Sequence, residues 1–308
     1  MDSVAVIMST YNGERYLSEQ IDSLLAQSDV DASLYIRDDG SSDGTLSLLE
    51  EYGRKNDNIT VTKGNNVGVG SSFMAALKSA GIRADYYAFA DQDDIWLPEK
   101  LHRAIDCIKE LGEGRPVCYC SNQTLVDARG EIIGIRHKEP VDTGYLQILC
   151  NNMVTGCTMV WNRELQRILS DGKYTPSSRL LKKRIHDVWA AMVAAVVGTI
   201  YYDNDSYIYY RQHENNVVGV RRENILKIWR KKLANPDLRR GRSDLAREIV
   251  TLFGCDMVKT EIYERLQSYA NYSRSLRTKL LLTKDEEILK RSSEDKLTYL
   301  IKVMLGLF

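Results

Sequence analysis

The first hundred residues alternate apolar strands with amphipathic helices, and this alternation limits the fold more than any other feature of the sequence. Apolar runs predict strands at residues 4–9, 34–39, 59–63 and 86–91, and helices are expected at 14–27, 45–55 and 71–80. The first helix places Leu17, Ile21, Leu24 and Leu25 on one face. Strand–helix repeats of this length predict an α/β fold with a mostly parallel sheet covered by helices on both faces.

The rest of the chain divides into a looser continuation of this pattern and a helical end. We expect a fifth strand at 115–127, a sixth at 151–162, a helix at 187–198 and a final strand at 199–213. From about residue 221 the sequence is helical, basic and poor in glycine, so we place an α/β domain at 1–220 and a helical region at 221–308. Residues 1–210 hold 21 Lys and Arg against 29 Asp and Glu, whereas residues 211–308 hold 21 against 13. Opposite net charges predict different partners for the two parts.

Composition favours a globular protein of the cytoplasm. The chain has 308 residues, of which 44% are hydrophobic, which is enough for a large core. Its six cysteines show no C-x-x-C pair, so reduced and mostly buried thiols are expected. Met1 is followed by Asp2 without a signal peptide, and no apolar run approaches the roughly 20 residues that span a bilayer. We expect a cytoplasmic location, free or peripheral on the inner face of the cell membrane.

Polar or glycine-rich segments follow each of the first four expected strands. They are residues 9–13, 37–45, 64–73 and 91–94. Ligands of open α/β sheets bind at the carboxyl ends of the strands, where such segments meet. Four of them at one edge predict a binding site there.

The fourth of these segments carries three aspartates, Asp91, Asp93 and Asp94. Carboxylates at a strand end are hard oxygen ligands that suit Mg²⁺ or Mn²⁺, with substrate phosphates completing the coordination. The alternative is a helix cap before Pro98 with solvated neighbours, and Asp94 is open to that role.

The glycine-rich segment after the third strand does not predict a nicotinamide cofactor. In "GVGSSF" the third glycine of a dinucleotide motif is replaced by Phe73, and the segment follows the third strand instead of the first. Backbone amides near Gly68 can still contact a nucleotide.

Six motifs in this order carry a family resemblance: "STYNG", "RDDGSSDGT", "GNNVGVGSSF", "FADQDDIWLPEK", "HDVW" and "YYRQHENNVVG". The chain resembles the inverting glycosyltransferase family 2, and within it the bacterial branch that includes rhamnosyltransferases of surface polysaccharides. The resemblance covers about residues 3–219. It implies a GT-A fold, which binds nucleotide-sugars, and a nucleotide-diphosphate sugar donor.

The resemblance also implies roles for individual residues. Ser9 and Tyr11 would line the base and ribose pocket, and Asp39 would bond the pyrimidine. Asp91 would contact the ribose or take part in the metal site, and Asp93 and His213 would bind the metal. The expected nucleotide-sugar set is completed by Gly68, Gln92 and, as a diphosphate contact, Arg211.

Asp187 in "HDVW" matches the catalytic base, which deprotonates the acceptor hydroxyl during inversion. Its alternative role is the N-cap of the following helix, and capping and catalysis can coexist there. His186 beside it would tune the base or be exposed. Trp96, Thr155 and Gly156 match the region that shapes the acceptor pocket, with core packing as the alternative.

The basic stretch at 221–242 places Ile225, Leu226, Trp229 and Leu233 at helical spacing among cations. Such a helix suits an anionic lipid surface, and residues 299–308 are apolar enough to dip into a membrane without crossing it. The alternative is a helical bundle that packs on the catalytic domain or on a second subunit of a homo-oligomer.

We therefore expect a metal-dependent transfer of one sugar to a growing surface glycan, carried on a lipid. The expected donor is dTDP-rhamnose, and UDP-galactose, UDP-glucose and UDP-N-acetylglucosamine remain alternatives that the sequence does not separate. A non-catalytic scaffold of a polysaccharide-assembly complex is the other alternative. Nucleic acid is not an expected partner, because aromatic and basic residues do not interleave in the basic region.

Overall fold

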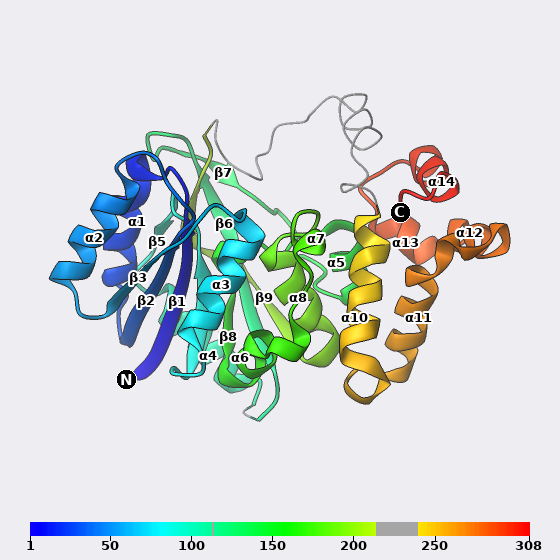
Figure 1. The fold of residues 1–308 in the computed structure, drawn as a ribbon, viewed down its shortest axis with the longest axis horizontal. Coiled ribbons are helices and arrows are strands. Elements are labelled where there is room, and N and C mark those ends of the chain that lie inside the picture. The colour runs from blue at the N-terminus through cyan, green and yellow to red at the C-terminus, as the bar shows by residue number, and fades with distance from the viewer. Residues whose placement is uncertain (113, 214–239) are drawn as a thin grey trace.

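A computed structural model describes residues 1–112, 114–213 and 240–308 of the chain. Its centre is a nine-stranded sheet in the order β3-β2-β1-β4-β8-β6-β9-β5, with β7 paired to β6 (Figure 1). The strands are β1 Asp2–Thr10, β2 Val30–Asp38, β3 Ile59–Lys63, β4 Tyr86–Ala90, β5 Ile95–Trp96, β6 Val117–Val126, β7 Ile132–Ile135, β8 Val160–Asn162 and β9 Thr199–Arg211.

The part of the sheet that carries the first four strands is parallel. β1 lies between β2 and β4 and is parallel to both, and β2 is parallel to β3. β6 and β9 are also parallel, whereas β5, β7 and β8 join the sheet in antiparallel pairs. The chain leaves β1 for β2 on one side and later returns to β4 on the other, which creates the switch point where ligands bind in open α/β sheets. The expected α/β fold is confirmed.

Helices cover both faces of the sheet, as the alternating pattern predicts. Along β1, Val4, Val6 and Met8 pack with α1, α2 and α4, whereas Ala5 and Ile7 pack with α3, α6 and α8. The helices of this part are α1 Glu14–Leu25, α2 Thr45–Lys55, α3 Val69–Ala80, α4 Lys100–Glu110, α5 Tyr145–Asn151, α6 Arg163–Ser170, α7 Ser178–Leu181 and α8 His186–Val197. Because neighbouring side chains of a strand point to opposite faces, both sides of β1 are buried.

The expected sixth strand at 151–162 is mostly wrong. Only β8 is a strand there, preceded by α5, a turn and a short 3-10 helix at Gly156–Thr158. The Asn152 side chain bonds both the N–H and the C=O of Val154, and the Thr158 hydroxyl donates to the Thr155 carbonyl. These side chains offer the backbone local partners, so the segment turns instead of extending the sheet.

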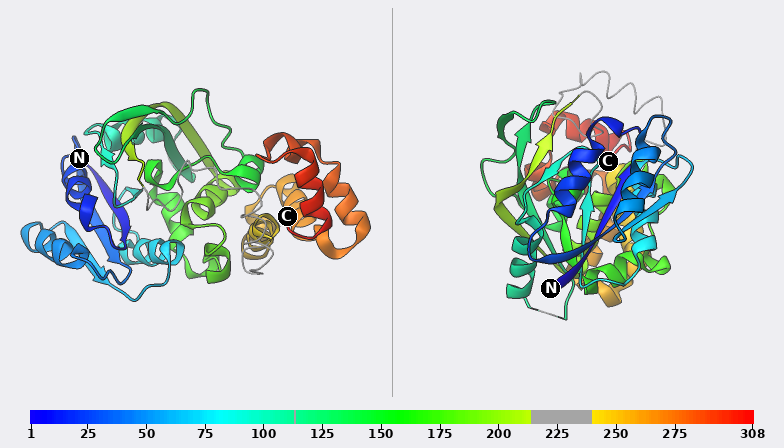
Figure 2. Two further views of the ribbon diagram at one scale, coloured as in Figure 1. Left: turned by 90° about the horizontal axis from the view of Figure 1, so that it is seen from above. Right: turned by 90° about the vertical axis from the view of Figure 1, so that its left-hand side faces the viewer.

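The helices of the C-terminal part lie beside α5, α7 and α8, at the end of the molecule away from β3 (Figures 1 and 2). They are α10 Gly241–Met257, α11 Thr260–Ala270, α12 Leu276–Thr283, α13 Glu286–Arg291 and α14 Lys296–Met304. Their apolar residues belong to the same core cluster as those of α3 and α8. Lys183 pairs with Asp244, and Arg242 donates to the Cys150 carbonyl, so polar contacts also join the two parts.

The expected boundary near residue 220, and most of the expected basic helix at 221–242, lie outside the described residues. Among the helices of the described ranges, none has both the length and the apolar character needed to cross a bilayer. All six cysteines are free and five are buried, with Cys255 exposed, which confirms the expected reduced thiols.

Candidate active site

The carboxyl ends of β1, β2 and β4 meet at one edge of the sheet, where a large cavity opens. The cavity extends from the ends of these strands past the 3-10 helix to the start of α8. Every residue that we expected in the site lines it, except Trp96 and Arg211. The fold therefore brings together residues that are up to about two hundred positions apart in the chain.

Asp39, which follows β2, is fixed on the cavity wall by an ion pair and two backbone amides. Its carboxylate accepts from the Arg37 guanidinium at 2.5 Å and from the N–H groups of Val67 and Gly68 at 3.0 and 2.9 Å. Gly68 has φ +86°, a backbone conformation that favours glycine, and this turns its N–H toward Asp39. The carboxylate is thus held in one orientation, as a group that recognises a planar base must be.

Ser9 belongs to the same hydrogen-bond chain. Its hydroxyl donates to Ser72 at 2.6 Å, and Ser72 also accepts from Arg37 at 2.7 Å. Side chains from β1, α3 and β2 are joined in this way next to Asp39.

Gln92 holds the β1–α1 turn from the other side of the cavity. Its side-chain oxygen accepts from the Tyr11 N–H at 2.8 Å, and its amide nitrogen donates to the Tyr11 carbonyl at 3.2 Å. Gly13 lies against the same side chain, where a Cβ would come within 2.4 Å of the Gln92 oxygen. Tyr11 itself is 48% exposed, so its ring is free to move over a ligand.

The β4–β5 loop brings Asp91 and Asp93 to the cavity together with His213. The Asp93 carboxylate lies 2.7 Å from the His213 Nε2. Burial and the charges of Asp93 and Asp187 raise the pKa of Asp91 to about 7. Neighbouring carboxylates that raise each other's pKa form a region that favours a bound cation.

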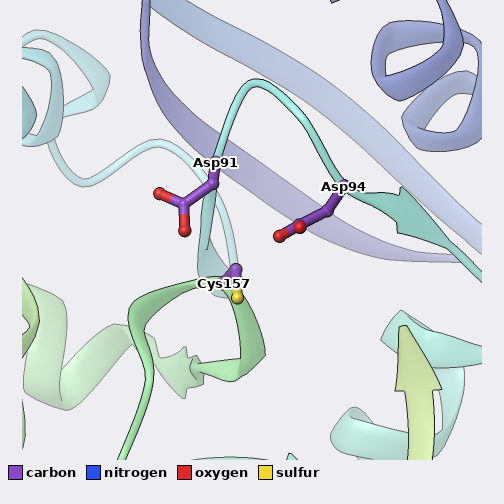
Figure 3. Close-up of side chains that lie close together, drawn as sticks. All are labelled: Asp91, Asp94 and Cys157. Carbon is purple, nitrogen blue, oxygen red and sulfur yellow. The ribbon is translucent and has the colours of Figure 1, made fainter. Parts of the chain in front are cut away.

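Asp94 is almost fully buried and turns away from the cavity toward Cys157. Figure 3 shows the side chains of Asp91 and Asp94, from the two ends of the loop, approaching Cys157 on the 3-10 helix. One Asp94 oxygen accepts from the Arg211 N–H at 3.1 Å, and the other has no hydrogen-bond partner. The suggestion that Asp94 caps the helix near Pro98 is therefore wrong, since this carboxylate bonds β9 instead.

Two groups of donor atoms in this loop are candidates for a divalent cation. Asp91, Asp94 and Cys157 have ligand atoms within 4.8 Å of one another, but burial raises the pKa of the Cys157 thiol, which keeps it protonated. A neutral thiol is a poor ligand for Mg²⁺ or Mn²⁺, which prefer oxygen. Asp91 and Asp93, with His213 beside them, line the cavity and leave positions open for phosphate and water. The oxygen and imidazole donors of this second group suit Mg²⁺ or Mn²⁺ chemically, but among the described residues their ligand atoms do not all lie within 4.8 Å of one another, as those of Asp91, Asp94 and Cys157 do.

Asp187 lies in the first turn of α8 and lines the cavity. Burial raises its pKa to about 6, against the lowering effect of hydrogen bonds from the Val188 and Gly156 amides. The helix begins after Ile185, so the alternative role of N-cap is wrong. A carboxylate with a pKa near 6 is suited to accept a proton at neutral pH.

Gly156 and Thr155 form the wall next to Asp187. A Cβ on Gly156 would lie 3.1 Å from the His186 Nε2 and 3.2 Å from the Asp187 Cβ, so glycine permits this close approach. The Thr155 hydroxyl donates to Gln123 at 3.3 Å, which leaves its oxygen at the cavity.

His186 is buried and not exposed. Its ring stacks on Phe73 at 3.7 Å between centroids and meets the edge of Phe89 at 4.8 Å. Burial lowers its pKa to about 3, so the imidazole is neutral, and neither ring nitrogen has a hydrogen-bond partner.

Trp96 and Arg211 were expected in the site, but neither lines the cavity. Trp96 is 2% exposed and packs over the Lys100 ammonium, 3.5 Å from the ring centroid, so core packing is its role. The Arg211 guanidinium donates to the Asp93 carbonyl at 3.0 Å and pairs with Glu19. It supports the β4–β5 loop from behind and does not reach the cavity.

Sequence reasoning missed Arg136 and Lys100. The Arg136 guanidinium lines the cavity, lies over the Tyr210 ring at 5.4 Å and lowers the pKa of Asp187 by its charge. Lys100 is fully buried without a hydrogen-bond partner, and burial lowers its pKa to about 7. Arg136 lies outside the six motifs, whereas Lys100 is the last residue of "FADQDDIWLPEK", where the motif gives no sign that the ammonium is buried.

Comparison with known proteins supports a common origin for this arrangement. The family model for glycosyl transferase family 2 matches residues 5–159. The dTDP-rhamnosyl transferase RfbG of Shigella flexneri is 33% identical over 223 residues, which are 69% of this chain and 73% of that protein. The uncharacterized glycosyltransferase RT0329 of Rickettsia typhi is 25% identical over 216 residues, which are 68% of this chain and 64% of that protein.

Among solved structures, the chain is similar in fold to S. aureus TarS 1-349. The complex with UDP superposes with a TM-score of 0.60 at 20% identity, covering 99% of this chain and 87% of that one. The complex with UDP-GlcNAc superposes with a TM-score of 0.57, covering 98% and 81%.

Proposed function

The chain belongs to glycosyltransferase family 2, and we propose that it transfers one L-rhamnose residue from dTDP-rhamnose to a growing, lipid-linked bacterial surface glycan. Its activity is that of a glycosyltransferase with a nucleotide-sugar donor. The proposal adds the sugar, the acceptor and the dependence on a metal.

One observation carries the proposal. A single cavity is lined by Asp39, Asp91, Asp93, Asp187 and His213, and the charges of Asp93 and Asp187 both act on Asp91. This set of groups suits a nucleotide held near Asp39, a diphosphate next to the acidic loop and an anomeric carbon facing Asp187.

The chain's own residues are able to perform an inverting transfer. The Asp187 carboxylate takes the proton of the acceptor hydroxyl while that oxygen forms a bond to the anomeric carbon. The bond from this carbon to the diphosphate breaks at the same time, and its electron pair leaves with the nucleotide diphosphate. Attack and departure on opposite faces invert the configuration, and no covalent enzyme intermediate is needed.

A divalent cation, Mn²⁺ or Mg²⁺, would be held by Asp91 and Asp93 with His213. When bound, it would offset the negative charge of the departing diphosphate. Gln92 keeps the β1–α1 turn in place over the same part of the cavity through its two bonds to Tyr11.

Rhamnose is supported by the similarity to RfbG, which spans most of both chains. UDP-galactose, UDP-glucose and UDP-N-acetylglucosamine remain the second candidates, because Asp39 can bond the ring of either uracil or thymine. The acceptor and linkage are expected from the branch that the chain resembles.

A donor comparison tests this function. Purified protein is incubated with each of the four nucleotide-sugars and Mn²⁺, with membranes from a polysaccharide-producing bacterium as acceptor, and nucleotide diphosphate release and labelled glycan are measured. We expect acceptor-dependent release from dTDP-rhamnose and none with the Asp187→Asn variant. Transfer from a UDP-sugar alone would contradict the proposed donor, and no transfer from any donor by folded protein would contradict the function.

A further inference from the structure

Two helices of the C-terminal part expose large apolar side chains. Leu276, Leu280 and Leu281 of α12 are 68%, 52% and 61% exposed. On α14 and directly after it, Leu297, Ile301, Met304 and Leu305 are 67%, 41%, 41% and 58% exposed. These seven residues, which we call the α12–α14 patch, are half of the fourteen large exposed hydrophobic residues among the described residues. Single exposed leucines are common, but such a concentration marks an interaction surface.

The helices that carry the patch are packed against the rest of the protein. The opposite sides of the same helices are buried, with Leu282 on α12 and Tyr299 and Val303 on α14. The two helices are tied together by bonds from the Tyr299 hydroxyl to the Leu282 carbonyl at 2.8 Å and from the Lys279 ammonium to the Met304 carbonyl at 2.7 Å. Each helix therefore has one apolar side that is buried in the protein and a second apolar side that is exposed.

The spacing of the exposed residues gives each helix a continuous stripe. Leu276 and Leu280 are four residues apart, and Leu297, Ile301 and Leu305 repeat at the same interval, so each set lies on one side of its helix. The helices lie at the end of the molecule away from β3 (Figure 1). We expected residues 299–308 to contact a membrane. Only some of them are exposed enough to do so, because Tyr299, Val303 and Phe308 are buried in the protein.

The charges around the patch select its partner. Residues 276–284 contain Arg277, Lys279 and Lys284, and residues 296–308 contain Lys296 and Lys302, of which Lys302 pairs with Glu294. The acidic residues of this part lie next to the two stretches, at positions 285–287 and 294–295. Arg277, Lys284 and Lys296 are exposed. Apolar side chains bordered by cations are what a helix needs to lie on a bilayer with anionic head groups.

A second copy of this chain fits the patch poorly. In a symmetric dimer the same surface meets itself, so the cations of one copy would face the cations of the other. A surface with negative charge is the complementary partner.

We propose that the α12–α14 patch is a docking surface for anionic phospholipid bilayers and lays this end of the protein on the membrane. It adds a partner to the protein and does not depend on which sugar is transferred. The helices enter only the head-group and upper acyl region, because neither is long enough to cross.

Vesicle co-sedimentation of the full chain tests this proposal. Binding is compared between two kinds of vesicle, one of phosphatidylcholine alone and one in which about 30% of the lipid is phosphatidylglycerol. This lipid gives the second kind of vesicle a negative surface potential. We expect binding to the anionic vesicles only, weakened by salt. The double variant Leu280→Asp with Ile301→Asp should lower the partition coefficient more than about tenfold, because apolar burial is lost and charge is repelled.

A second variant separates charge from apolar contact. Arg277→Gln with Lys296→Gln removes two exposed cations, each worth about fivefold at an anionic surface, so partitioning should fall about 25-fold. Ile82→Asp is the matched control, because Ile82 is 49% exposed outside the patch. It should bind like the unchanged protein. Circular dichroism and nucleotide binding confirm that each variant is folded.

Three results would overturn the proposal. One is a folded protein that does not bind anionic vesicles, and another is binding that the two patch variants leave unchanged. The third is a dimer in sedimentation velocity that Leu280→Asp with Ile301→Asp dissociates, which would make the patch a protein interface. Nucleotide binding is measured separately, so none of these results bears on the proposed sugar transfer.

Discussion

The carboxyl ends of β2 and β4 both carry neighbouring aspartates at the same edge of the sheet, but the surroundings of these carboxylates differ. At the end of β2, Asp38 accepts from the Thr10 and Ser41 hydroxyls and from two backbone amides, and Asp39 is held by Arg37 and two more amides. After β4, Asp94 has an oxygen without a partner, and burial and like charge raise the pKa values of Asp91 and Asp94.

This difference separates a recognition loop from a cation loop. A carboxylate that is held by several bonds from its own protein keeps one orientation, in which a remaining lone pair can accept a hydrogen bond from a ligand. The unpartnered oxygen after β4 belongs to Asp94, which faces Cys157, whereas Asp93 pairs with His213 at the cavity. Neighbouring carboxylates such as Asp91 and Asp93 lower their free energy when a cation lies between them.

We expect the largest effect from a substitution of Asp187. This residue is a buried carboxylate and, like Asp91 and Asp94, has a raised pKa. Asp187→Asn should lower the transfer rate by about 10³-fold, because an amide cannot accept the proton of the acceptor hydroxyl. Nucleotide affinity in calorimetry should change little, since the proposed role of Asp187 is at the acceptor hydroxyl and not at the nucleotide.

Asp127→Asn is the matched control for this variant. Asp127 also lines the cavity, but its carboxylate is bonded by the Arg129 and Glu131 amides, as in the loop after β2. The account fails here if Asp127→Asn abolishes transfer and Asp187→Asn does not.

The pH profile of transfer gives the next largest effect. A base works only when it is deprotonated, and the pKa of Asp187 is about 6. The value of kcat/KM should therefore be constant above this pH and fall about tenfold per unit below it. A rate that rises as the pH falls would mean that the titrating group acts as an acid.

We expect the smallest effects on the free energy of unfolding of two variants, Asp38→Asn and Asp94→Asn. These two variants test the difference between the ends of β2 and β4 directly. Asp38→Asn removes acceptors from buried bonds and should lower the free energy of unfolding by about 2 kcal/mol. Asp94→Asn should not lower it in EDTA at pH 7.5, because the Arg211 bond is kept and an unpartnered carboxylate oxygen is removed. Urea unfolding of the two variants and the unchanged protein measures both values, and equal losses would remove the distinction between the loops.

Local sequence patterns predicted the parallel part of the fold well. The strands and helices up to β4 follow directly from alternating and 3.6-residue periodicity, and the convergence of their ends follows from the topology. The β8 region was predicted poorly, because Asn152 and Thr158 close local turns that a run of apolar residues does not reveal.

The site was predicted where motifs mark it and missed where tertiary contacts decide. Asp93 and His213 lie 2.7 Å apart although 120 positions separate them in the chain, and their role as metal ligands stays a prediction. Trp96 and Arg211 occupy motif positions, yet the fold turns them inward to Lys100 and Glu19. Arg136 reaches the cavity from a segment without a motif, so only its position in space identifies it.

The most direct test of the account is a calorimetric titration of the protein with dTDP and UDP, each in Mn²⁺ and in EDTA. The account predicts that the unchanged protein binds nucleotide at least about tenfold more tightly with Mn²⁺, and that Asp93→Asn removes this gain while binding in EDTA stays the same. Equal affinity in Mn²⁺ and EDTA, or a gain that survives in Asp93→Asn, would contradict the claim that the loop after β4 holds a cation for the diphosphate.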